Sequence, residues 1–157
     1  DAVRAVKPEP VEPDKSNVDT TKKLHCTISI DCATILNNLS DLDPAKLDVL
    51  PTDGVVLGAV TVEFSEGESV FDVLQRVCRE NNIHLEATFT PGYNSAYVEG
   101  IHNLYEFDCG ELSGWMYSVN GWFPNYGCSR YAVQDGDVIR WRYTCDLGAD
   151  VGGSMVA

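Results

Sequence analysis

One segment of the chain, residues 69–82, has a much clearer helical pattern than any other, and segments with strand patterns lie on both sides of it. Ser69 is placed to cap this helix, and Asn81-Asn82 end it. Between them the apolar residues recur at helical spacing, at Val70, Val73, Leu74, Val77 and Cys78. A single helix of this kind has to bury its apolar side against a sheet, so the pattern predicts an α+β fold.

The strands around that helix are expected from alternation and from turns. Over residues 25–32 apolar side chains alternate with polar ones, and a last strand, 138–145, begins after the Asp135-Gly136 turn. The other expected strands cover 55–64, 83–89, 96–101 and 104–108. This order predicts a β-grasp-like mixed sheet with one main helix packed across it, in which the first and last strands lie parallel and adjacent.

A second, shorter helix is expected over residues 39–50. Asp43 is placed as its cap and Pro44 at its first helical position. This segment links the first two expected strands.

The chain of 157 residues is long enough for one compact domain with a short extension. Residues 1–23 contain three prolines, five acidic and five basic residues without sustained periodicity, so we expect a spacer there. The domain is expected over 24–151, followed by a tail at 152–157. Because no run of 18 or more apolar residues occurs, we expect no membrane insertion.

Charge and cysteine content restrict the partners and the compartment. A formal net charge of −13 repels phosphate backbones, so nucleic acid is not an expected partner. Six cysteines without a CxxC pair favour disulfides over a metal site, and disulfides form in oxidising compartments. The chain starts without a methionine or a signal peptide. We therefore expect a mature or trimmed piece of an exported protein, either secreted or attached to a cell surface.

Residues 105–131 hold 8 of the 15 aromatic residues of the chain, interleaved with glycine, serine, asparagine and proline. Turn residues return the backbone to the surface, so these rings cannot all be core. Rigid aromatic side chains on short turned strands are typical of recognition surfaces. We therefore expect an aromatic-rich β-hairpin that binds a partner.

Within this segment several positions have two interpretations. Trp115 and Tyr117 share one face of a strand and could equally fill the core. Trp122 and Phe123 are adjacent and so point to opposite faces, which leaves one of them exposed as an anchor beside Pro124. Asn120-Gly121 is interpreted first as a type I′ turn and only second as a contact point.

The sequence does not choose among the possible cysteine pairings. Cys109 and Cys128 flank the aromatic segment, so a bridge between them would clamp its two ends. Cys32 is expected level with Cys145 if the first and last strands run parallel, which leaves Cys26 with Cys78. Alternatively, Cys78 could reach Cys32.

Candidates for catalysis or metal binding are weak. The three histidines, His25, His84 and His102, lie in different elements, and none stands beside a nucleophile in an activating pattern. The carboxylates at 41, 43, 48 and 53 lack the glycine and glutamate of a calcium loop, which indicates a solvated acidic face. We expect no enzymatic activity, no cofactor and no bound metal.

The run GWMYSVNGWFPNYGCSRYAVQDGDVIRWRYT, preceded by GESVFDVL, resembles the transcobalamin C-terminal-like family over roughly residues 25–151. This family includes the β-grasp lobe of vitamin B12 carriers and modules of bacterial surface proteins. In the carriers such a lobe closes over one side of a corrinoid, and a helical domain that these 157 residues do not include supplies the other side. The resemblance implies ligand-facing side chains at Trp115, Tyr117, Asn120, Trp122, Phe123 and Tyr126.

The sequence is compatible with two functions. The first is a non-enzymatic extracellular module whose aromatic hairpin contacts a small molecule, corrinoid-like by family resemblance. The second is an adhesion module that contacts a cell-surface protein or glycan without a small-molecule pocket. A pocket of several hundred cubic ångströms between hairpin and sheet favours the first, and a convex aromatic ridge favours the second. Complete burial of the rings would instead favour a structural spacer.

Overall fold

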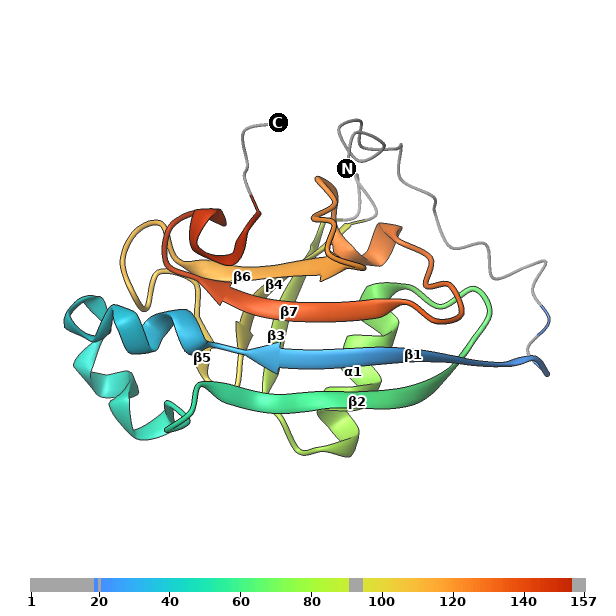
Figure 1. The fold of residues 1–157 in the computed structure, drawn as a ribbon, viewed down its shortest axis with the longest axis horizontal. Coiled ribbons are helices and arrows are strands. Elements are labelled where there is room, and N and C mark those ends of the chain that lie inside the picture. The colour runs from blue at the N-terminus through green and yellow to red at the C-terminus, as the bar shows by residue number, and fades with distance from the viewer. Residues whose placement is uncertain (1–18, 20, 91–94, 154–157) are drawn as a thin grey trace.

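The computed structural model describes residues 19, 21–90 and 95–153, so the expected spacer and tail lie largely outside the described residues. A mixed four-stranded sheet forms one layer of the domain (Figure 1). Its order is β2 (Val55–Ser65), β1 (Lys23–Asp31), β7 (Val138–Thr144) and β6 (Gly114–Val119). β1 and β7 run parallel, and β2 and β6 are antiparallel to their neighbours. The expected parallel pairing of the first and last strands is therefore confirmed.

The remaining strands form a second, three-stranded antiparallel sheet rather than extending the first one. It consists of β3 (Leu85–Thr90), β4 (Ser95–Ile101) and β5 (Leu104–Tyr105). β5 is shorter than expected because Phe107 has a left-handed backbone (φ +71°), which ends extended pairing. The second sheet and helix α1 (Val70–Glu80) lie on the same side of the four-stranded sheet (Figure 1).

Helix α1 begins where the sequence predicts, and a reciprocal capping box sets its first turn. The backbone N–H of Asp72 donates to Ser69 Oγ (3.1 Å), and the backbone N–H of Ser69 donates to Asp72 Oδ2 (2.9 Å). All five apolar positions predicted on its inner side are buried, and they pack against the inward side chains of β1 and β7. These strand residues are Cys26, Ile28, Ile30, Ile139, Trp141 and Tyr143.

The helix expected over residues 39–50 is replaced by short 3₁₀ turns. They span Ala33–Asn37, Leu39–Asp41 and Pro44–Val49, and further 3₁₀ turns occur at Cys128–Arg130 and Ala149–Val151. Asp43 does cap the third turn, since its Oδ1 accepts a hydrogen bond from the backbone N–H of Ala45 (3.0 Å). No helix in the described part of the chain has the length and apolar character needed to span a bilayer.

The turn at Asn120-Gly121 has positive φ at both residues (54° and 82°), as a type I′ turn requires. Val119 and Trp122 exchange two backbone hydrogen bonds across it (2.8 and 3.0 Å). Beyond Trp122, however, no second hairpin strand occurs in the described chain before β7, and β6 pairs along its whole length with β7. The aromatic segment is thus a strand, a tight turn and a long returning loop.

The Asn120 side chain joins this turn to the start of β7. Its Nδ2 donates to Asp137 Oδ1 (2.9 Å), and its Oδ1 accepts from the backbone N–H of Val138 (2.8 Å). We expect Asn120→Ala to lower the free energy of unfolding by about 1–2 kcal/mol more than Asn103→Ala does. Asn103 is the matched control because it also has positive φ (62°), while its side chain makes no hydrogen bond to the described residues. Equal losses in urea titrations would show that backbone strain alone accounts for the effect.

Candidate functional site

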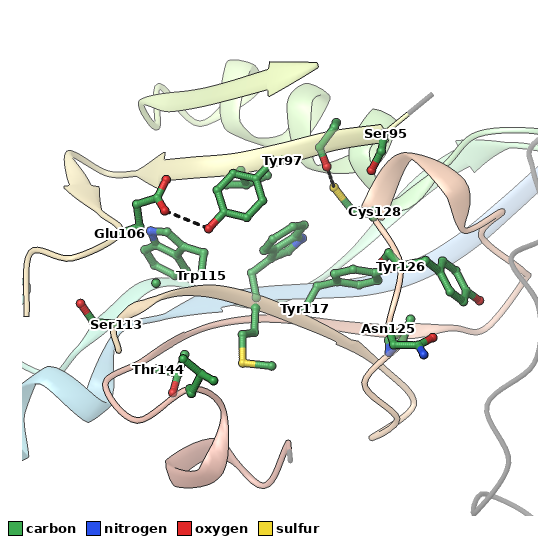
Figure 2. Close-up of a pocket in the computed structure, with 18 of the residues that line it drawn as sticks. Ser95, Tyr97, Glu106, Ser113, Trp115, Tyr117, Asn125, Tyr126, Cys128 and Thr144 are labelled. Atoms are coloured by element: carbon green, nitrogen blue, oxygen red, sulfur yellow. Dashed lines mark hydrogen bonds between the residues drawn. The ribbon is translucent and has the colours of Figure 1, made fainter. Parts of the chain in front are cut away.

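A cavity of about 470 Å³ opens between β4 and β6, the edge strand of the four-stranded sheet (Figure 2). We call it the inter-sheet cavity. Side chains of β4 and β6 line it, together with two loops, 106–113 and 124–128, and residues at the end of β7. In Figure 2, Trp115 and Tyr117 point from β6 toward β4, and Tyr97 of β4 points back toward them. The cavity therefore lies where the two sheets diverge.

The floor of the inter-sheet cavity is aromatic and rigidly held. Trp115 donates from Nε1 to the backbone oxygen of Leu104 (2.8 Å), and the hydroxyl of Tyr117 donates to the backbone oxygen of Tyr126 (2.8 Å). The rings of Tyr117 and Trp141 pack at a centroid distance of 5.4 Å. Burial raises the pKa of Tyr117, so its hydroxyl stays protonated at any physiological pH. These anchors fix the rings in place before a ligand arrives.

One buried donor in this floor has no partner. Trp141 is 2% exposed, and its indole Nε1 makes no hydrogen bond within the part of the chain that the structure describes. Leaving such a donor unpaired costs about 1–3 kcal/mol. Trp141 lines the cavity, but its Nε1 is itself buried, so an acceptor on a ligand would reach it only if neighbouring side chains moved.

The mouth of the cavity carries exposed apolar side chains. Phe107 is 63% exposed and Tyr97 is 51% exposed, and Leu112 and Leu147 are exposed beside them. Apolar groups gathered around a concave opening are typical of a binding surface.

The charges at the cavity are all negative. Glu106 and Glu111 line it, and no lysine, arginine or histidine is among the described lining residues. The hydroxyl of Tyr97 donates to Glu106 Oε1 (3.0 Å), and partial burial together with this hydrogen bond raises the pKa of Tyr97 to about 12. Uncharged and cationic ligands are therefore favoured over anionic ones.

Three of the six predicted site residues, Trp115, Tyr117 and Tyr126, line the inter-sheet cavity. The other three do not. Asn120 forms the turn described above, and Trp122 packs edge-on against Tyr126 at a ring distance of 6.2 Å. Phe123 is half-buried, and its ring lies so close to Gly153 that a Cβ there would approach it to 2.8 Å. Trp122 and Phe123, the expected anchor pair, therefore pack against other parts of the chain. Only Trp122 continues the pairing with β6, through a single bridge to Val119.

Sequence reasoning missed several cavity residues that were not among the six predicted site residues. Tyr97 comes from β4, Phe107 and Leu112 from the 106–113 loop, and Trp141 from β7. Phe107 and Leu112 did carry a signal, since they are large apolar residues within a segment of glycine and acidic residues. No sequence signal indicated that β4 and β6 lie beside each other, because these strands belong to different sheets.

All six cysteines, each within the described residues, are free thiols in the structure, so the three predicted disulfide pairs stay predictions. Cys109 contacts the backbone oxygen of Asn38 (3.4 Å), and Cys128 contacts that of Ala96 (3.9 Å). The register of β1 on β7 pairs Asp31 with Arg142, so Cys32 is level with Tyr143 rather than with Cys145. Cys128 lines the cavity, and burial raises its pKa to about 12, so it is a protonated thiol at neutral pH.

Residues 67–145 match a family model described as a domain of unknown function, DUF4430. A search among curated proteins finds no match to this chain. Among solved structures, haptocorrin in complex with Cbi shares 15% identity at a TM-score of 0.55, covering 83% of this chain and 27% of haptocorrin. A candidate metal-binding protein from Ruminococcus gnavus ATCC 29149 shares 16% identity at a TM-score of 0.45, covering 77% and 96%. The likeness to haptocorrin shows a common fold, and this chain spans about a quarter of haptocorrin's length.

Proposed function

Because this chain belongs to the DUF4430 family, a family of unknown function, we propose its function from the inter-sheet cavity: it is a non-enzymatic extracellular binding module for the apolar part of a small molecule. The observation that carries this proposal is a cavity of about 470 Å³ with an aromatic floor already held by hydrogen bonds. Small-molecule sites commonly enclose roughly 300–1,000 Å³ and are largely formed before the ligand binds. The concavity favours a small-molecule receptor over a flat contact surface.

The absence of enzymatic activity is supported by the titratable groups at the cavity. Its only thiol, among the described lining residues, is Cys128, whose raised pKa makes it a poor nucleophile. His84, outside the cavity, is engaged by the backbone N–H of Asn103 at Nδ1 (3.0 Å) and by the Tyr105 hydroxyl at Nε2 (2.9 Å). The extracellular setting rests on the cysteine content and on the resemblance described above.

The ligand we propose is flat or apolar, and uncharged or cationic. A corrinoid is one test compound, since the haptocorrin of similar fold was solved in complex with Cbi. A whole corrinoid is larger than the cavity, so this module would hold one edge or side arm of it.

A second candidate function is contact with a cell-surface protein or glycan. The exposed mouth residues Phe107, Leu112 and Leu147 favour it, because they offer apolar area outside the cavity as well as at its entrance. In that case the mouth would contact the partner while the floor stayed empty.

Tryptophan fluorescence separates these two functions. The three tryptophans are Trp115, Trp122 and Trp141, and only Trp122 does not line the cavity. In a Trp122→Phe background the signal therefore comes from the cavity floor alone. Corrinoids, apolar amines and cell-surface glycans would be titrated in turn. Saturable quenching by a small compound supports the receptor function, and binding of a glycan or protein without a change at the floor contradicts it.

A matched pair of phenylalanines tests the mouth. Phe107→Ala is expected to weaken binding of the compound found in that titration several-fold, because the ring covers the entrance. Phe89→Ala removes a ring of similar exposure (54%) on β3 that does not line the cavity, so it should leave affinity unchanged. Isothermal titration calorimetry of both variants gives the comparison. Equal losses would place the binding site elsewhere.

A further inference from the structure

Two cysteines that are distant in the sequence lie together beside the mouth of the cavity. Cys109 belongs to the 106–113 loop, and Cys145 directly follows β7. Their side chains are close enough that each shifts the pKa of the other thiol. Each also contacts the same 3₁₀ segment, since Cys109 Sγ lies 3.4 Å from the backbone oxygen of Asn38 and Cys145 Sγ lies 3.6 Å from Thr34 Oγ1. The two sulfurs are therefore located where three segments meet, namely the 106–113 loop, the end of β7 and this 3₁₀ segment.

The backbone around this pair is held independently of the sulfurs. The backbone N–H of Cys109 donates to Ser113 Oγ (3.1 Å). The hydroxyl of Tyr143 donates to the backbone oxygen of Tyr105 (2.8 Å), and its oxygen lies 3.0 Å from the same Ser113 Oγ. The backbone N–H of Leu147 donates to the oxygen of Leu112 (3.0 Å). The loop and the end of β7 are thus already docked, so a covalent link would join two segments that contact each other without it.

The other cysteines are less well placed to compete. Cys128 contacts Ala96 across the cavity, and Cys26 and Cys78 belong to the core beneath α1. Cys32 is near enough to Cys145 for that thiol to contribute to its raised pKa, but it lies level with Tyr143 in the β1–β7 register. Cys109 is therefore the best partner for Cys145.

We propose that Cys109 and Cys145 form a disulfide in oxidising surroundings, which ties the loop that carries Phe107 and Leu112 to the segment that carries Leu147. This pairing differs from the pairs expected from the sequence. Its consequence, a mouth of fixed shape, rests on the proposed function; the bond itself does not.

The chemistry needs a disulfide oxidant, for which we take oxidised glutathione. Cys145 is half-buried and Cys109 is buried, so Cys145 is the more accessible thiol and reacts with the oxidant first. The Cys145 thiolate attacks one glutathione sulfur, breaks that disulfide and releases one glutathione thiolate. The Cys109 thiolate then attacks the Cys145 sulfur and releases the second glutathione. Two electrons pass to glutathione, and the two thiol protons are transferred to the released thiolates.

The pH dependence has a definite sign. Burial, followed by the interaction with the Cys145 thiol, raises the pKa of Cys109 to about 12, and burial also raises the pKa of Cys145. Asp41 and Asp150 act on Cys145, and Asp41 and Asp108 on Cys109, all in the same direction. The reactive thiolates are thus scarce at neutral pH, so oxidation should be faster at pH 9 than at pH 7.

Tryptic mapping of the whole chain tests the pairing. After oxidation at pH 9, free thiols are alkylated and the chain is digested. Trypsin places Cys109 and Cys128 in the peptide 80–130, Cys145 in 143–157, and Cys26 with Cys32 in 24–46. A Cys128→Ser variant makes Cys109 the only cysteine of its peptide. In this variant we expect peptides 80–130 and 143–157 to be linked, at a mass two hydrogens below their sum.

Several results would overturn the proposal. They are a link between 24–46 and 143–157, or full alkylation of Cys109 and Cys145 after oxidation. In the protein with Cys128 intact, a bridge within peptide 80–130 would do the same, since it would show the Cys109–Cys128 pair. Cys109→Ser should abolish the link and the Cys128→Ser variant should retain it. None of these results depends on a ligand, so they are independent of whether the cavity binds one.

Discussion

Leu74→Ala should lower the free energy of unfolding of this domain by about 2–5 kcal/mol, the range typical of large-to-small substitutions in a packed core. Leu74 is 0% exposed on the inner side of α1, where the helix packs against the four-stranded sheet. Removing its side chain deletes apolar contacts and leaves a void that neighbouring β-branched side chains cannot fill. Urea denaturation followed by circular dichroism measures the difference.

Leu47→Ala is the matched control, since the same atoms are removed from a side chain that is 54% exposed on a 3₁₀ turn. Its effect should stay within about 0.5 kcal/mol. If both variants lost the same stability, the core would not be the α1–sheet interface described above.

Neutralising the two carboxylates at the cavity should change which ligands bind. Glu106→Gln together with Glu111→Gln removes the charged groups among the described lining residues. A carboxylate several ångströms from a ligand charge in a half-solvated site contributes about 1 kcal/mol. For a cationic and an anionic compound of the same shape, the affinity ratio should therefore fall by about tenfold or more. Titration of such a pair at low salt measures this ratio.

The control for this experiment changes net charge by the same amount elsewhere. Glu63→Gln with Glu80→Gln lies on β2 and at the end of α1, away from the cavity. This variant should keep the ratio of the original protein. A similar fall in both variants would mean that the overall charge of −13, and not the cavity, sets the preference.

Local patterns were sufficient to predict most of the fold. Ser69 and the apolar spacing after it located α1, and the alternation from Cys26 to Ile30 located the buried face of β1. The division into two sheets was not predictable, because β3 and β4 have the same pattern whichever sheet they join. The helix expected at 39–50 became 3₁₀ turns, since the cap at Asp43 sets a start but not a helix type.

The candidate site was predicted only in part, because local patterns do not show which segments pack together. Trp115, Tyr117 and Tyr126 lie within the aromatic segment and do line the inter-sheet cavity. Trp122 and Phe123 looked equally suitable by composition, but their contacts with Tyr126 and Gly153 depend on where the returning loop folds. Tyr97 comes from a strand that only tertiary packing brings beside β6. A sequence pattern locates side chains along a strand but does not say which strands face each other.

The parallel pairing of β1 with β7 also affects how this domain folds during its synthesis. Thr27 and Val138, adjacent in the central pair of strands, are more than a hundred residues apart in the sequence. High contact order of this kind slows folding, because a long loop must close before the pairing contributes any stability. On the ribosome the sheet cannot be completed until its last strand has left the exit tunnel. A truncated product that ends before residue 138 would expose the edge of β1 and become a target for aggregation or proteolysis.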